Sequence, residues 1–88
     1  MTIVVHSAPG CVQCTYTERH ADRKDIDIEV VHLDEHPDIL DQIKERGITA
    51  APFVVVIDEN GVEIDNWTGF QPQKLNEYGA KQRELALA

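Results

Sequence analysis

The sequence predicts an α/β fold, a single domain over residues 1–88 in which a four-stranded mixed sheet carries three helices on its faces. The chain is long enough for one hydrophobic core but has no room for a second. Short β-branched runs alternate with segments of helical periodicity, which favours strands covered by helices. A turn between the last two strand-like runs adds a hairpin, so the predicted order is β-α-β-α-β-β-α.

The first half of the chain begins with a strand, a helix and a second strand. Thr2–His6 (TIVVH) has the pattern of a short buried strand, and the loop Ser7–Gly10 follows it. A helix is predicted from Cys11 to about Lys24 mainly from its βαβ context, because its threonines are mediocre helix formers and its apolar stripe is thin. The β-branched run Ile28–Leu33 (IEVVHL) predicts the second strand.

The second helix carries clear start and stop signals. Pro37 suits its first turn, and acidic residues crowd that end of the segment. Ile39, Leu40 and Ile43 form one apolar face. Gly47 follows the basic residues of the last turn, so the helix is expected to end there.

A hairpin and a last helix complete the predicted fold. After the loop Ile48–Pro52, the apolar run Phe53–Ile57 predicts a buried strand, and the sequence DENG predicts a turn. Val62–Trp67 alternates in polarity and predicts the half-exposed partner strand. The last helix is predicted to begin at Pro72, with Gly79 expected to weaken it.

Composition and charge exclude several classes of function. Hydrophobic residues make up 42% of the chain, which is typical of a folded soluble domain, and the net charge of −8 disfavours nucleic acid and anionic membrane as partners. No signal-peptide pattern or membrane-spanning stretch is evident, so we expect a cytoplasmic protein in a reducing compartment. Residues 1–18 contain no lysine or arginine, so chemistry there has no cation close in sequence.

Both cysteines lie in one short stretch, PGCVQCTY, as Cys11 and Cys14. This C-x-x-C spacing permits a structural staple, half of a metal site or a redox pair. A staple is disfavoured because closing so short a loop removes only about 2 kcal/mol of unfolded-state entropy. A reducing compartment would also not preserve such a bridge.

A zinc or iron–sulfur site needs three or four ligands, and the C-x-x-C pair supplies only two. The histidines available to complete it are His6, His20, His32 and His36. His32 and His36 have a suitable spacing, but they flank the end of a strand and the start of a helix. We therefore expect the histidines at surface or edge positions, and no bound metal.

A redox pair explains where the cysteines lie. Cys11 is placed at the open end of the first helix, where backbone N–H groups and the helix dipole favour the thiolate. Cys14 lies one turn further on, within reach of the same sulfur but more shielded. Lowering a thiol pKa from about 8.5 to about 7 takes roughly 2 kcal/mol, which a helix N-terminus can supply. We expect Cys11 to be a mild attacking nucleophile and Cys14 to be the resolving cysteine.

The sequence TAAP, which ends at Pro52, is the second element of the predicted site. This proline stands between a helix stop and a buried strand, where its peptide bond is either cis in a tight turn or an ordinary strand entry. If this loop meets the cysteines, the backbone of Ala51 could pair with an extended substrate strand.

Three spaced motifs resemble those of one family. They are Cys11–Cys14 (CVQC), Pro52 within APFVV, and Trp67–Pro72 (WTGFQP). Over essentially the whole chain, they resemble the NrdH-redoxins, which are glutaredoxin-like proteins with the thioredoxin/glutaredoxin fold.

The resemblance implies a dithiol electron carrier that needs no bound cofactor. Members of this family pass electrons to a class Ib ribonucleotide reductase and are reduced again by thioredoxin reductase, so we expect a monomer that meets both as protein disulfide substrates. It also implies a cis peptide bond before Pro52, facing the cysteines, and a loop beside the site that begins at Trp67. The residues expected to bind partners are Val12, Gln13, Ala51, Pro52, Trp67, Gly69 and Phe70.

The chain departs from the family pattern at two places. His6–Pro9 (HSAP) stands where family members often have YTKP, so a lysine before the cysteine pair is missing, and Gln71 and Gln73 stand where an arginine and an acidic residue are common. The main alternative is a glutaredoxin that depends on a low-molecular-weight thiol. It ranks lower because the carboxylates of a tripeptide need cations or helix N-termini, and the active-site segment has no lysine or arginine until Arg19. A zinc or iron–sulfur binding module is the remaining alternative.

Overall fold

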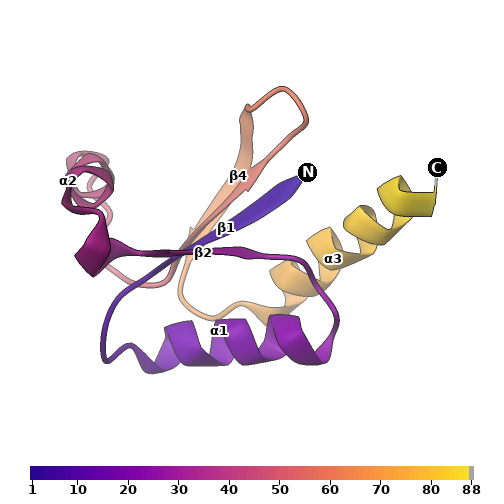
Figure 1. The fold of residues 1–88 in the computed structure, drawn as a ribbon, viewed down its shortest axis with the longest axis horizontal. Helices are drawn as coiled ribbons and strands as arrows, with labels where there is room; N and C mark the ends of the chain where they lie inside the picture. Colours follow the sequence, from indigo (N-terminus) through magenta and orange to yellow (C-terminus); the bar gives the residue numbers. More distant parts are fainter. Residues whose placement is uncertain (88) are drawn as a thin grey trace.

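The structure is a computed structural model that describes residues 1–87, and its elements follow the predicted order (Figure 1). None of the helices in this range is long and apolar enough to cross a membrane. The elements are β1 (Thr2–Ser7), α1 (Val12–Arg23), β2 (Glu29–His32), a 3₁₀ turn (Leu33–Glu35), α2 (Pro37–Glu45), β3 (Phe53–Ile57), β4 (Glu63–Thr68) and α3 (Pro72–Leu87).

The four strands form one mixed sheet in the order β2-β1-β3-β4. β1 runs parallel to β2, and Val5 lies opposite Val30. The other two pairs are antiparallel, with Val54 of β3 between Val5 of β1 and Trp67 of β4. The parallel pair needs a crossover, which α1 provides, whereas the β3–β4 pair is a hairpin. The predicted mixed sheet with three helices is confirmed.

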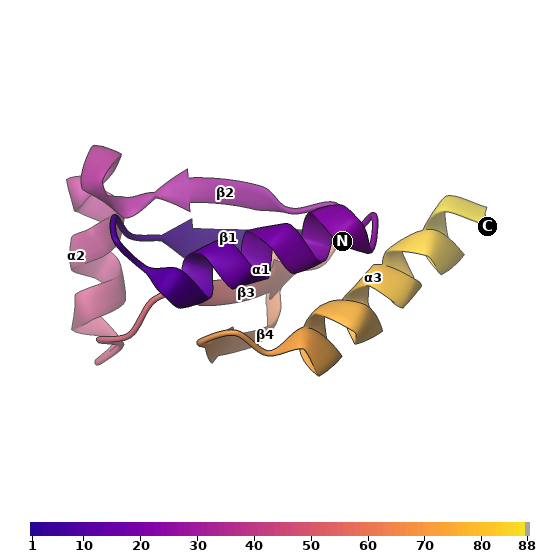
Figure 2. The ribbon, with the colours of Figure 1, turned by 90° about the horizontal axis from the view of Figure 1, so that it is seen from below.

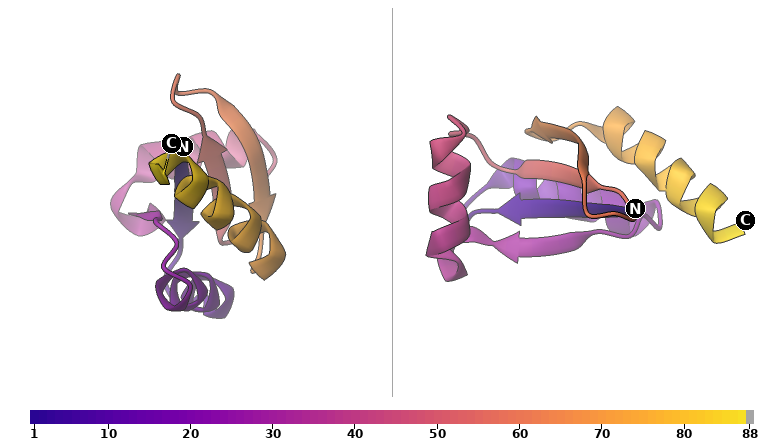
Figure 3. Two further views of the ribbon diagram at one scale, coloured as in Figure 1. Left: turned by 90° about the vertical axis from the view of Figure 1, so that its right-hand side faces the viewer. Right: turned by 90° about the horizontal axis from the view of Figure 1, so that it is seen from above.

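Helices cover both faces of the sheet. Figure 2 shows α1 lying along the strands with α3 on the same side, and in Figure 3 α2 crosses the strand direction at one end of the sheet. Side chains alternate along β3, so that Val54 and Val56 join the larger core under α1 and α3. Phe53 and Val55 point the other way and join a smaller core under α2. The end of the sheet nearest α2 therefore has apolar cores on both faces.

The helix boundaries follow from local capping. Helix α1 begins at Val12 because Cys11 is its N-cap, with an extended backbone of φ −92° and ψ 107°. The segment after β2 does not continue as a strand, because Leu33 opens a 3₁₀ turn and buries its side chain in the core under α2. Gly47 ends the second helix as predicted, since its φ of +79° suits glycine and its N–H donates to the carbonyl of Lys44.

Strand β4 begins at Glu63, one residue later than predicted. Asp58 closes the preceding turn by accepting the backbone N–H of Val62 at 3.0 Å. The ladder to β3 then shifts register, which leaves Ile64 as the extra residue of a bulge. Val62 and Ile64 are consequently about half exposed, and Trp67 is the buried residue of this strand.

Gly79 has a packing role in the last helix. A Cβ at this position would lie 2.6 Å from Cγ1 of Ile26, a core residue in the segment between α1 and β2. Glycine therefore lets α3 approach that segment closely. This close approach explains why a glycine, which disfavours helix formation, stands inside α3.

Candidate active site

Cys11 and Cys14 are joined by a disulfide at the N-terminal end of α1, with their Cα atoms 5.2 Å apart. The Sγ atom of Cys11 accepts the backbone N–H of Cys14 at 3.1 Å. A sulfur thus occupies the place where a capping oxygen usually sits, and it faces the unpaired N–H groups of the first helical turn. This is the environment that the sequence predicted for a thiolate.

The two sulfur-bearing residues differ in exposure. Cys14 is only 2% exposed, whereas Cys11 is partly exposed and its neighbour Val12 is 62% exposed. A hollow of about 290 Å³ opens beside the disulfide, and its walls include both cysteines and Glu18. An incoming sulfur atom therefore meets Cys11 first.

The Ala51–Pro52 peptide bond is cis, as the resemblance implied. Pro52 is buried, and its carbonyl oxygen accepts the N–H of Gly69 at 3.0 Å. Ala51 is partly exposed and lines an apolar hollow together with Ala8, a residue of the loop that leads to Cys11. Ala8 also lines the hollow beside the disulfide, so the cysteine loop and the proline loop border one another.

Gln13, one of the two residues between the cysteines in the sequence, holds the loop that follows β4. Its Oε1 atom accepts the backbone N–H of Phe70 at 2.9 Å. A Cβ on Gly69 would lie only 2.8 Å from the same Oε1 atom, and Gly69 has a φ of +82°. The backbone conformation therefore favours glycine here, and a Cβ would also displace the end of the Gln13 side chain.

The ring of Phe70 lies against α1, beside Tyr16 and His20. Its centroid is 5.9 Å from that of Tyr16 and 5.8 Å from that of His20. His20 is 7% exposed, and its Nε2 lies 2.7 Å from Oδ1 of Asn76 in α3. The prediction of surface or edge histidines is wrong for His20, because this residue lies on the face of α1 that packs against α3.

The remaining histidines do not gather near the cysteines. His6 is partly buried, with its ring stacked on Phe53 and its Nδ1 2.9 Å from the Phe53 carbonyl oxygen. His32 and His36 are exposed. Within residues 1–87, no group of three or more His, Cys, Asp or Glu side chains is arranged to hold a metal ion.

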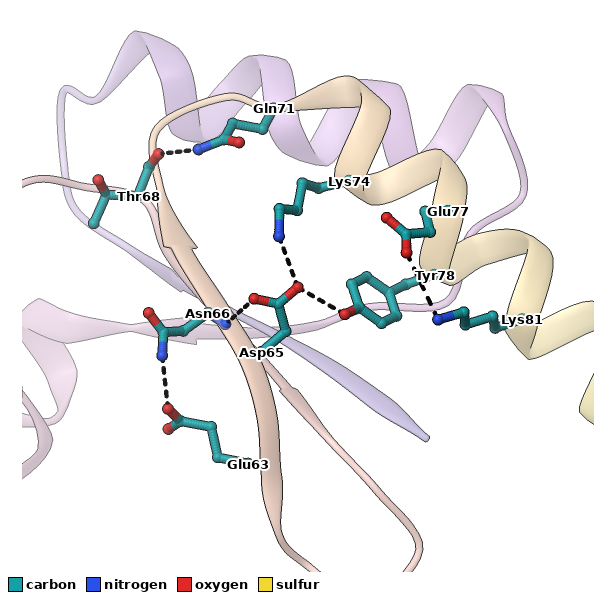
Figure 4. Close-up of polar contacts among 9 residues, drawn as sticks. All are labelled: Glu63, Asp65, Asn66, Thr68, Gln71, Lys74, Glu77, Tyr78 and Lys81. Atoms are coloured by element: carbon teal, nitrogen blue, oxygen red, sulfur yellow. Dashed lines mark hydrogen bonds and ion pairs between the residues drawn. The ribbon is translucent and has the colours of Figure 1, made fainter.

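Asp65 of β4 ties α3 to the sheet (Figure 4). Its Oδ2 atom accepts bonds from Lys74 Nζ at 2.8 Å and from the Tyr78 hydroxyl at 2.7 Å. The bond from Lys74, followed by that from Tyr78, holds the pKa of Asp65 below its usual value. The same bond to Asp65, together with burial, raises the pKa of Tyr78 to about 12. Trp67 stacks on Tyr78 and is 6% exposed. Its buried ring therefore anchors the start of the loop that follows β4.

An apolar hollow of about 470 Å³ lies between α2 and the loop before Pro52. Leu40, Ile43 and Ile48 form much of its wall. Among the described residues that line this hollow, Lys44 is the only one with a charged side chain. No pattern in the sequence indicated that α2 brings Lys44 to the same hollow as Ala51. Glu18, in contrast, could have been recognised from the sequence as a neighbour of the cysteines, because it stands one helical turn after Cys14.

The family and the relatives of the chain agree with this geometry. The Glutaredoxin family pattern matches residues 3–62. The glutaredoxin-like protein NrdH of Salmonella typhimurium is 30% identical over 76 residues, which cover 86% of both chains. The protein of the same name from Lactococcus lactis subsp. lactis is 27% identical over 73 residues, 83% of this chain and 93% of its relative.

A solved structure shows the same fold. The glutaredoxin-like NrdH-redoxin from Escherichia coli, described as having a thioredoxin-like activity profile, superimposes with a TM-score of 0.75 and 27% identity, over 88% of this chain and 93% of that one. The predicted thioredoxin/glutaredoxin fold is thereby confirmed. The chain belongs to the glutaredoxin family, as a thiol–disulfide oxidoreductase of the NrdH-redoxin type.

Proposed function

We propose that this redoxin donates electrons to protein disulfides, with Cys11 as the attacking and Cys14 as the resolving cysteine. The observation that carries the proposal is the Cys14 N–H bonded to Cys11 Sγ at the end of a helix. A sulfur that accepts an N–H bond at the positive end of a helix is stabilised as thiolate. The greater exposure of Cys11 supports the same assignment of roles.

The proposed reaction has two exchange steps. The Cys11 thiolate attacks one sulfur of the client disulfide, and the other client sulfur leaves as a thiolate and takes up a proton. Cys14 then loses its proton and attacks Cys11 Sγ, which forms the Cys11–Cys14 disulfide and releases the second client thiol. Two electrons pass from the redoxin to the client, and a reductase must return them.

The surroundings of the disulfide support a protein client. Ala51 lies partly exposed beside the buried Pro52, in a position to pair its backbone with an extended segment. Val12, next to Cys11, is 62% exposed, and Phe70 is partly exposed beside Tyr16, so apolar surface is also available on α1 and on the loop after β4. We propose a class Ib ribonucleotide reductase as the client and thioredoxin reductase as the electron donor.

One observation favours the second candidate, a glutaredoxin that uses a low-molecular-weight thiol. Lys44 lines the hollow that Ala51 borders, so one cation is available for a carboxylate of a small thiol. A tripeptide such as glutathione carries two carboxylates, and a second cation does not line either hollow beside the site within residues 1–87. We therefore place this candidate second.

Reduction of the oxidised protein separates the two candidates. The protein is incubated with NADPH and thioredoxin reductase, or with NADPH, glutathione and glutathione reductase, and NADPH consumption is followed. We expect rapid reduction in the first system and slow reduction in the second. Rapid reduction only by glutathione would reverse the ranking, and a Lys44→Glu variant would then lose that activity.

Variants of the two cysteines test the assigned roles. Cys11→Ser is expected to abolish reduction of client disulfides, because the attacking sulfur is gone. Cys14→Ser is expected to accumulate a covalent adduct with the client, visible by intact mass, because the mixed disulfide is not resolved. Full turnover in either variant would rule out the two-step mechanism.

A further inference from the structure

The hollow beside the disulfide contains one group that the two exchange steps leave unassigned. Its walls include the cysteines, the hydroxyl-bearing residues Ser7 and Thr15, and Glu18. Glu18 is the only titratable side chain, other than the cysteines, among the described residues that line it. The second step requires Cys14 to lose a proton inside this hollow.

Helix geometry directs Glu18 toward Cys14. Residues four apart on an α-helix lie on one face, with Cβ atoms about 5–6 Å apart. Side chains on a helix tilt toward its N-terminus, so that Glu18 leans toward the turn that carries Cys14. Glu18 is partly buried, and within residues 1–87 no hydrogen bond or ion pair engages its carboxylate.

The other polar groups nearby are committed elsewhere or are poor proton acceptors. The Thr15 hydroxyl donates to the carbonyl oxygen of Cys11 at 3.3 Å. His20 is paired with Asn76 under Phe70, and His6 is held against Phe53. Cys14 itself is 2% exposed, so bulk water has little access to its thiol.

We propose that the Glu18 carboxylate accepts the proton of Cys14, directly or through one water molecule, as Cys14 attacks the mixed disulfide. The proton moves from Cys14 Sγ to a Glu18 oxygen while the Cys14–Cys11 bond forms and the Cys11–client bond breaks. Glu18 then returns the proton to solvent through the open side of the hollow, and the client thiolate is protonated from solvent. The inference rests on the proposed roles of Cys11 and Cys14.

Electrostatics alone makes the opposite prediction, which allows a clear test. A carboxylate near a thiol disfavours the thiolate, so removing the charge of Glu18 would speed both exchange steps if charge were its only effect. A proton acceptor instead speeds the second step, in which the shielded thiol must ionise, and its loss slows that step.

The test uses the reduced protein and one equivalent of an aromatic disulfide that releases a coloured thiolate in each step. In stopped flow, the first phase reports attack by Cys11 and the second reports resolution by Cys14. We expect Glu18→Gln to slow the second phase by about tenfold or more, while the first phase is unchanged or faster. Asp22→Asn is the matched control, because it removes a carboxylate from an exposed position of the same helix.

Rescue by a small acid distinguishes a proton acceptor from a structural role. In Glu18→Ala, added formate at constant ionic strength is expected to restore the second phase in proportion to its concentration. An unchanged or faster second phase in Glu18→Gln, or an absence of rescue, would overturn the inference about Glu18. Failure of Cys14→Ser to form a mixed disulfide with the aromatic disulfide would instead contradict the proposed function.

Discussion

At the scale of single residues, the Gln13 side chain links the cysteine turn to the loop after β4, and that loop is bonded in turn to the cis-proline loop. Gln13 lies between the cysteines in the sequence and accepts the N–H of Phe70, while the N–H of the preceding Gly69 goes to Pro52. Two hydrogen bonds therefore connect the cysteine turn, the cis-proline loop and the loop after β4. A residue that a motif search treats as a spacer therefore holds the loop after β4 against the cysteine turn.

Substitution of Gly69 tests this link. Gly69→Ala must place a Cβ in a left-handed conformation, at a cost of about 1–2 kcal/mol, and must also displace the Gln13 amide, at a further cost of about 1 kcal/mol. Gly61→Ala is the control, because Gly61 has a φ of +78° with open space around the added Cβ. Urea unfolding should show Gly69→Ala to be the more destabilising by about 1 kcal/mol.

A double variant isolates the contribution of Gln13. In a Gln13→Ala background the collision is absent, so Gly69→Ala and Gly61→Ala should have equal effects on the free energy of unfolding. A persistent difference between them would mean that something other than the Gln13 side chain constrains Gly69.

The site could be predicted where its signals are local in sequence. The C-x-x-C pair at a helix start identified Cys11 and Cys14 as a redox pair, whereas the place of Pro52 beside them was implied by the family resemblance. The pairing of His20 with Asn76 and the approach of Lys44 to Ala51 depend on how separate helices pack on the sheet. No periodicity or motif encodes those contacts, so they required the structure.

At the scale of elements, Asp65 is the residue that fastens α3 to β4, as Figure 4 shows. The strand and helix boundaries around it were predicted to within a residue, because turns, prolines and β-branched runs are local signals. The bulge at Ile64 was not predicted, since an extra residue in a ladder is visible only when both strands are placed. The hydrogen bonds to Asp65 were not predicted for the same reason, because they join side chains of β4 and α3.

The Tyr78–Asp65 bond predicts a loss of stability at high pH. The phenol has a pKa of about 12 in the folded protein and about 10 when unfolded, so its contribution is complete below pH 10 and is lost as the pH rises toward 12. We expect the unfolding free energy of the wild type to exceed that of Tyr78→Phe by about 1–3 kcal/mol at pH 8 and to approach it near pH 12.

Urea unfolding between pH 8 and 12 measures this difference, with both cysteines changed to serine so that disulfide exchange does not interfere. Tyr16→Phe is the control, because Tyr16 is 49% exposed and lies outside the Asp65 network. The free energy of unfolding of Tyr16→Phe should fall between pH 8 and 12 in parallel with that of the wild type. A constant gap between the wild type and Tyr78→Phe across this range would show that the phenol does not contribute through Asp65.

At the scale of the whole molecule, charge is distributed unevenly around the reactive sulfur. The chain carries a net charge of −8, and residues 1–18, which include the cysteine turn and Glu18, contain no lysine or arginine. Lys44 approaches the site from α2, on the side of the apolar hollow. The field that an approaching disulfide meets is therefore mainly negative, which favours a cationic partner surface and raises its encounter rate at low salt.

Small disulfides of opposite charge measure this field directly at the reduced protein. A doubly cationic diamine disulfide should react with Cys11 about ten times faster than a doubly anionic dicarboxylate disulfide at roughly 10 mM salt, where the screening length is about 30 Å. The two rates should converge at roughly 0.5 M salt, while an uncharged diol disulfide is the control whose rate stays constant. A faster reaction with the dicarboxylate would mean that Lys44 and the helix N-terminus dominate at Cys11. That result would favour the glutathione-dependent candidate over a protein client, because glutathione disulfide is itself anionic.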